Sequence, residues 1–157
     1  MRLSVVASLA LLAATTAIAA PLTKQAALKI MHERHEGMEA VGKANKTLRR
    51  ELAAGSPNLA TIRGASATMA TLASRSSRWF PKGTGPDVGK TGAKPEIWQK
   101  PADFAEKSRA FEAATKQLDA AAQSGDVAVI KAAFGEVGKT CKSCHDPYRA
   151  PDEDHDR

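Results

Sequence analysis

The last helical stripe of this chain runs directly into its two cysteines. Inward positions recur at alternating steps of three and four through Val127, Ile130, Phe134, Val137, Cys141 and Cys144. Residues at this spacing share one face of a helix, so both thiols are predicted to face the interior of the fold. Only residues 146–157 follow Cys144 and His145 in the chain. We therefore expect most side chains that pack against the two thiols to come from earlier helices.

Three other segments have the same helical periodicity, and strand signals are nearly absent. They cover residues 22–54, residues 56–78, and a third segment that starts between 95 and 103 and ends at 124. Ser56 followed by Pro57 predicts the start of the second helix, and Asp126 is predicted to cap the fourth. The connections at 55 and 125 are short, whereas prolines and glycines break the segment 81–95. We predict an all-α fold, an antiparallel up-down-up-down four-helix bundle.

The first twenty residues have the pattern of an export signal. Arg2 precedes an alanine-rich apolar run that contains Ala17-Ile18-Ala19, the small-x-small pattern of a cleavage site. The run is shorter, and richer in small residues, than a membrane-spanning helix of about 20 apolar residues. We expect residues 1–19 to be a cleaved signal peptide and the mature protein to lie in the periplasm.

Charge divides the rest of the chain into two parts. Residues 20–150 hold 21 of the 23 basic residues and 13 of the 17 acidic ones, a net charge of +8. The tail 151–157 has four acidic residues against Arg157 and is expected to be disordered. We predict one bundle domain over 20–150 whose basic surface docks an acidic periplasmic or membrane-bound redox protein. An exported chain without a recognisable binding motif is not expected to bind nucleic acid.

The run Cys141-Lys142-Ser143-Cys144-His145 has the spacing that attaches c-type haem. Each thiol can form a thioether with the porphyrin, and the adjacent imidazole can become an axial ligand of the iron. A thioredoxin-like dithiol would need a βαβ context, which is missing. A zinc site would need further ligands, and His32, His35 and His155 do not have a usual zinc spacing. We therefore predict one covalently bound haem c near the C-terminus of the bundle, with His145 as its proximal iron ligand.

A second iron ligand is expected to come from the first helix. With the first and last helices antiparallel, a rise of about 1.5 Å per residue places His145 level with residue 35. Met31 and Met38 lie on either side of that level on the inward stripe, and periodicity does not separate them. Arg34 falls on the same stripe. We expect it to pair with a haem propionate, unless its long stem carries the charge out to water.

Four stretches of the chain resemble class II cytochromes c, the cytochrome c′ family. They are residues 141–149 with their Tyr-Arg ending, 79–86, 93–98 and 34–42. In the family, an arginine on the first helix precedes the distal residue by four positions, which implies Met38 as the distal residue. An alternative register gives these roles to Lys24 and Leu28, but it requires extra residues before Pro57.

Within this family, the distal residue separates two kinds of protein. Methionine there is typical of low-spin members of the c-556 type, which transfer electrons. The resemblance therefore implies a periplasmic electron-transfer protein with His145 and Met38 as axial ligands, and Arg34 and Arg149 at the haem propionates. The alternative is a five-coordinate, high-spin cytochrome c′ that binds NO or CO. Neither reading is an enzyme, and the family also implies a homodimer through the first two helices.

Overall fold

The structure is a computed structural model that describes residues 22–151. The predicted signal peptide (1–19) and all of the acidic tail except Pro151 lie outside the described residues.

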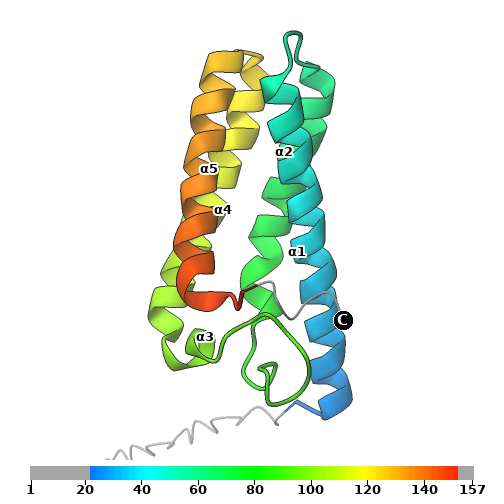
Figure 1. Cartoon of the computed structure of the whole chain (residues 1–157), viewed down its shortest axis with the longest axis vertical. Helices are drawn as coiled ribbons and strands as arrows, with labels where there is room; N and C mark the ends of the chain where they lie inside the picture. The colour runs from blue at the N-terminus through cyan, green and yellow to red at the C-terminus, as the bar shows by residue number, and fades with distance from the viewer. Residues whose placement is uncertain (1–21, 152–157) are drawn as a thin grey trace, which may run out of the picture.

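Four long helices run lengthwise, and consecutive ones point in opposite directions (Figure 1). The elements are α1 (Lys24–Ala53), α2 (Leu59–Ser76), the 3-10 turn η1 (Ser77–Trp79), α3 (Glu96–Gln99), α4 (Pro101–Ser124) and α5 (Val127–Tyr148). α1 packs on α2, α2 on α4, and α4 on α5, whereas α1 and α5 have no comparable interface. Over residues 22–151 there is no strand, only one isolated β-bridge between Ala93 and Arg149. The predicted four-helix bundle is confirmed.

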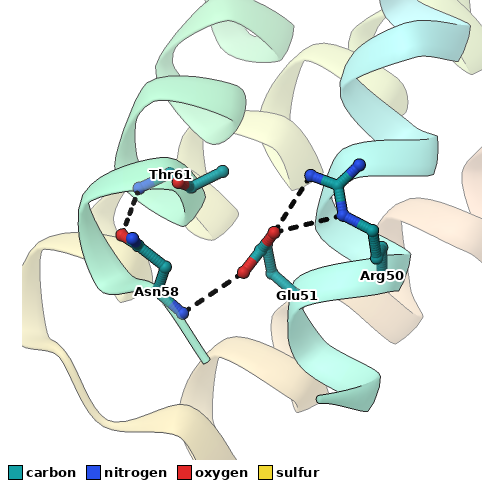
Figure 2. Close-up of polar contacts among 4 residues, drawn as sticks. All are labelled: Arg50, Glu51, Asn58 and Thr61. Atoms are coloured by element: carbon teal, nitrogen blue, oxygen red, sulfur yellow. Dashed lines mark hydrogen bonds and ion pairs between the residues drawn. The ribbon is translucent and has the colours of Figure 1, made fainter. Parts of the chain in front are cut away.

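The start of α2 differs from the prediction. Asn58, rather than Ser56, is the N-cap, and its side-chain oxygen accepts a hydrogen bond from the Thr61 N–H at 3.0 Å. Figure 2 shows the Glu51 carboxylate at the end of α1 between Asn58 and Arg50; it accepts from the Asn58 N–H at 3.3 Å. The chain needs residues 54–57 to turn between the antiparallel helices, so Pro57 lies before the cap rather than inside the helix.

The other helix ends agree with the local signals. Gly125, with a φ of 75°, ends α4 in the left-handed region that suits glycine. Asp126 caps α5 as predicted, since its carboxylate accepts from the N–H groups of Ala128 and Val129 at 2.8 and 3.2 Å. The third helical segment is divided into the short α3 and the long α4, which starts at Pro101.

The core consists of two clusters. The larger one fills the half of the bundle towards the α1–α2 and α4–α5 turns, and its buried residues are Ala44, Leu48, Leu52, Ile62, Met69, Ala114, Leu118, Ala121, Ala122, Ile130 and Val137. The smaller one lies at the opposite end, where the loop after α2 covers the bundle (Figure 1). Its buried residues are Ile97, Phe104 and Tyr148, with Phe80, Ala93, Trp98 and Cys144 packed against them.

None of the helices described over residues 22–151 is both long enough and apolar enough to cross a membrane.

Candidate haem site

The two thiols lie where the two core clusters meet. Cys141 packs against the larger cluster and Cys144 against the smaller one, and both side chains are half-buried. Burial is the largest cause of the raised pKa of each thiol, so both groups are predominantly neutral near pH 7. His145, the next residue, is exposed on the same turn of α5. The predicted placement of the thiols on the inward stripe is therefore observed.

On α1, the structure separates the two candidate methionines. Met31 is 7% exposed and lies under the loop after α2, where its methyl carbon would be 3.4 Å from a Cβ atom at Gly89. Its surroundings are thus those of a packing residue. Met38 is half-buried beside Gly37, at the level between loop-bound Arg34 and Val41, which packs on the larger cluster. The level of Met38 therefore matches the level of the two thiols, between the clusters.

Arg34 is held entirely inside the molecule. It is 4% exposed, and its guanidinium donates to Thr84 Oγ1 and O at 3.3 and 3.0 Å, to Thr91 Oγ1 at 2.9 Å and to the Trp79 carbonyl at 3.2 Å. The alternative in which its stem carries the charge to water is therefore wrong. Burial lowers the pKa of Arg34 to about 10, which still leaves it charged at neutral pH. Four hydrogen bonds, rather than solvent, compensate for that buried charge.

The loop after α2 also closes onto the last turn of α5. The Lys94 N–H donates to the Tyr148 carbonyl at 3.0 Å, and the Ala150 N–H donates to the Gly92 carbonyl at 2.8 Å. The indole of Trp98 donates to the carbonyls of Phe80 and Pro81 at 3.1 and 3.0 Å. The loop is therefore tied to both helices that flank the site, α1 through Arg34 and α5 through its backbone.

Sequence reasoning missed the roles of Tyr148 and Asp103. The Tyr148 hydroxyl donates to the Asp103 carboxylate across the α4–α5 pair. Burial first, and then this hydrogen bond, raise the pKa of Tyr148 to about 12. Spacing carries no signal for such a contact, because the two residues are 45 positions apart.

A cavity with mainly aromatic and aliphatic walls lies beside the smaller cluster, and Cys141, Cys144 and His145 are not among its lining residues. Its volume is about 450 Å³, and its lining residues are Ser77, Phe80, Lys82, Ile97, Trp98, Pro101, Phe104, Ala105 and Ser108. Phe80, Ile97, Trp98 and Phe104 also belong to the cluster that contains Cys144.

The side chains of Cys141, Cys144 and His145 suit an iron porphyrin better than a bare metal ion. Within residues 22–151, no group of three or more His, Cys, Asp or Glu side chains is arranged to hold a metal. His32 and His35 lie on the exposed face of α1. Nε2 of His32 is 3.3 Å from Oε1 of Glu36, and Nε2 of His35 is 3.6 Å from Oε1 of Glu39. The thiols and His145, by contrast, lie within five residues of each other on α5, as covalent haem attachment requires.

Known proteins with similar sequences and structures share this architecture. The model of the family described as Cytochrome C′ matches residues 29–149. The chain is 35% identical over 141 residues to cytochrome c′ of Allochromatium vinosum, which covers 87% of this chain and 88% of that protein. Cytochromes c′ of Alcaligenes xylosoxydans and Rubrivivax gelatinosus align over 54% and 53% of their own length, so the chain spans about half of each.

Solved structures agree over most of the chain. A cytochrome c′ described as having ligand-controlled dimer dissociation superposes with a TM-score of 0.74 and 31% identity, covering 84% of this chain and 100% of that one. A nitric oxide complex of a point mutant of cytochrome c prime from Alcaligenes xylosoxidans gives a TM-score of 0.70 and 31% identity, covering 82% and 97%.

These relatives overturn the predicted function. The expected low-spin electron carrier, with His145 and Met38 both bound to iron, is wrong, because the matched family and most of these relatives are cytochromes c′. The physical reason for the error is that a methionine thioether on an inward stripe packs as readily as it ligates, and sequence spacing does not distinguish the two. The findings favour the alternative, a high-spin protein of the gas-binding kind.

Two observations converge on one family. The family model covers well over half of the chain, and a relative aligned over 88% of its own length is 35% identical. Proteins of this kind carry covalently bound haem c, for which this chain supplies its two cysteines. The chain belongs to the cytochrome c′ family.

Proposed function

We propose that this protein binds NO or CO at a five-coordinate haem c held by Cys141, Cys144 and His145. The observation that carries the proposal is the position of the motif: two half-buried thiols at the junction of the two core clusters, with an exposed imidazole one residue further on. When bound, the haem would supply an iron that can take the His145 imidazole and a small gas as ligands.

The residues of α5 fix the proximal side. Because Cys141 and Cys144 are one helical turn apart, two thioethers would prevent the ring from rotating against α5. His145 follows directly on the same rigid helix, so its imidazole is positioned for the iron without a mobile loop. The capped start of α5 and the closure of its last turn by Gly92 and Lys94 support this geometry.

Met38 is proposed to form the distal wall rather than to ligate the iron. It lies on α1 at the level of the thiols, and its neighbour Gly37 is covered by the Trp79 ring. A flexible thioether at this position excludes water and yields to a small ligand. Arg34 and Arg149 remain proposed partners of the propionates; Arg34 would offer a guanidinium already held by Thr84 and Thr91.

Absorption spectra and CO binding test this function. The purified haem protein is expected to have high-spin ferric bands and a ferrous form that binds CO, since Met38 leaves the iron open. Met38→Ala should leave the spin state unchanged and raise the CO association rate about tenfold by removing the wall, a barrier change of about 1.4 kcal/mol. Met31→Ala is the matched control and should have little effect on that rate. Low-spin ferric bands that become high-spin in Met38→Ala would contradict the proposal.

Location and assembly follow as further parts of the proposal. The pattern of residues 1–19 supports export to the periplasm, and the family match supports a binding role rather than catalysis. A homodimer through α1 and α2 is supported by Leu22 and Leu28, which are 41% and 43% exposed on or just before α1. Sedimentation of the wild type against Leu28→Glu tests it: the substitution should shift the protein towards the monomer, and an unchanged mass would contradict this interface.

A further inference from the structure

The last turn of α5, which carries the end of the haem motif, lacks part of its own helical hydrogen bonding. Pro147 lies inside α5. Because proline has no N–H group, it cannot donate to the carbonyl of Ser143 four residues earlier. The helix ends one residue later at Tyr148, and the Arg149 N–H donates to the His145 carbonyl at 2.9 Å. The turn that contains His145 therefore depends more than the rest of α5 on contacts with other elements.

Tyr148 supplies such contacts from a single buried residue. It is 3% exposed, and its ring packs edge-on against Phe104, with 5.3 Å between the ring centroids. Its hydroxyl donates to the Asp103 carboxylate, and its carbonyl accepts from the Lys94 N–H at 3.0 Å. Asp103 and Phe104 both lie at the start of α4. The end of α5 is thus attached to α4 by the side chain of Tyr148 and to the loop by its backbone.

The acceptor of this hydrogen bond is itself held in place. Nζ of Lys107, one turn further along α4, lies 3.7 Å from Oδ1 of Asp103, whereas the Tyr148 hydroxyl binds Oδ2. A carboxylate in the first turn of a helix is also favoured by the helix dipole. Burial first, and then the contact with Asp103, raise the pKa of Tyr148 to about 12, so the hydroxyl retains the proton that it donates at neutral pH.

We propose that the hydrogen bond from Tyr148 to Asp103 fixes the orientation of the His145 imidazole at the haem iron. This role rests on the proposed haem attachment at residues 141–145 and adds two positioning residues to it. Tyr148 lies three positions after His145 and four after Cys144, so it neighbours both on the surface of α5. Holding Tyr148 in place also holds the turn from which the imidazole projects, and with it the angle of the imidazole plane about the iron–nitrogen bond.

Proton NMR of the haem-loaded ferric protein in excess cyanide measures that angle. Cyanide fills the sixth position whether the resting iron is open or bound by Met38, so the readout does not depend on gas binding, which CO binding by the wild type tests separately. The four haem methyl shifts then depend on the plane of the His145 imidazole. Tyr148→Phe, which retains the ring and loses the hydroxyl, should change the spread and order of these shifts. Asp103→Ala should change them in the same direction, and the double variant should change them no further.

Amide hydrogen exchange of the same haem-loaded proteins reports on the turn itself. Exchange in peptides that cover residues 145–149 should be at least about tenfold faster in Tyr148→Phe than in the wild type, as expected when a hydrogen bond to a charged group is lost.

Ser66→Ala is the matched control. The buried Ser66 hydroxyl donates to Oδ1 of Asp119 at 3.3 Å across the α2–α4 interface and to the Arg63 carbonyl at 3.1 Å. Asp119 lies about 24 Å along α4 from Asp103, at a rise of about 1.5 Å per residue. Ser66→Ala should leave both the haem methyl shifts and the exchange of residues 145–149 unchanged.

Three results overturn the proposal. Haem methyl shifts in Tyr148→Phe that equal those of the wild type do so even if exchange is faster, because the hydrogen bond would then only close the end of α5. Methyl shifts that change as much in Ser66→Ala do so as well, since any loss of stability would then be sufficient. A double variant whose effect is the sum of the two single effects would show that Tyr148 and Asp103 act separately.

Discussion

Gly37 is the residue on α1 against which the ring of Trp79 packs. A Cβ atom at this position would lie 2.4 and 2.5 Å from two ring carbons of Trp79. Gly42, five residues along the same helix, has no atom within 4 Å of the corresponding position. The two glycines therefore differ in physical role, although both are helical.

Alanine at these two positions should have opposite effects. Gly42→Ala is expected to stabilise the haem protein by about 0.5–1 kcal/mol, because alanine loses less backbone entropy in a helix. Gly37→Ala is expected to destabilise it by about 1–3 kcal/mol, because Trp79 must move away from α1. Denaturant unfolding of both variants measures this; a stabilising Gly37→Ala would show that Trp79 does not pack on α1.

The hydroxyl of Tyr148 should lose its proton at a higher pH than an ordinary tyrosine. Tyr148 is the single tyrosine of the chain, and its folded pKa of about 12 exceeds the ordinary value of 10.0. Because folding favours the neutral phenol, this contribution to stability is complete below pH 10.0 and is lost as the pH rises through about 12. Tyrosinate absorbance against pH measures the midpoint, with Tyr148→Phe as the blank. Asp103→Asn should lower the midpoint only part of the way, since burial of Tyr148 is the larger cause. A wild-type midpoint near 10.0 would contradict both the burial of Tyr148 and its contact with Asp103.

At the scale of elements, the start of α2 depends on one side chain. Asn58→Ala removes the oxygen that accepts the Thr61 N–H, and we expect a loss of about 1 kcal/mol in the free energy of unfolding. Ser56→Ala changes an exposed residue outside the helix and should cost much less. Equal costs in chemical denaturation would place the cap elsewhere.

Glu51 joins α1 to α2 in a pH-dependent way. Hydrogen bonds from Arg50 and from the Asn58 N–H lower its pKa below the ordinary 4.5 (Figure 2). The ionised form is thus favoured by folding, so its contribution is present above pH 4.5 and is lost as the pH falls through the folded pKa. Glu51→Gln should be less stable than the wild type at pH 7 and should approach it in acid. Thermal melts across this range measure the gap, with Glu106→Gln, at an exposed position of α4, as the control; a gap that does not change with pH would argue against the ion pair.

At the scale of the whole molecule, Arg34 connects a helix to the loop that closes the haem end. Lysine retains the charge but not the planar fork of donors, so Arg34→Lys leaves buried oxygens of the loop without partners. We expect a loss of about 2–3 kcal/mol in the free energy of unfolding. Chemical denaturation measures it, and Arg78→Lys on the surface is the control. If both variants lose the same amount, Arg34 does not organise the loop.

The fold was predictable because its signals are local. Alternating steps of three and four identify the helices, and Asp126 and Gly125 mark ends through contacts within a few residues. The partners of Arg34, by contrast, are 45 to 57 positions away, so the stripe that predicted its inward position could not name them. The spin state was mispredicted for the same kind of reason, because Met38 has the same side chain whether it packs or ligates.

Spacing within the chain was sufficient for the bundle, for the inward position of Cys141 and Cys144 and for the haem motif that ends in His145. Tertiary packing was needed to divide the core into two clusters with the thiols between them, to place Met31 under the loop, and to bring Pro151 beside Gly92. The difference is physical: helical periodicity depends on residues a turn apart, whereas a buried guanidinium, a loop closure or a distal wall depends on residues that only the folded chain brings together.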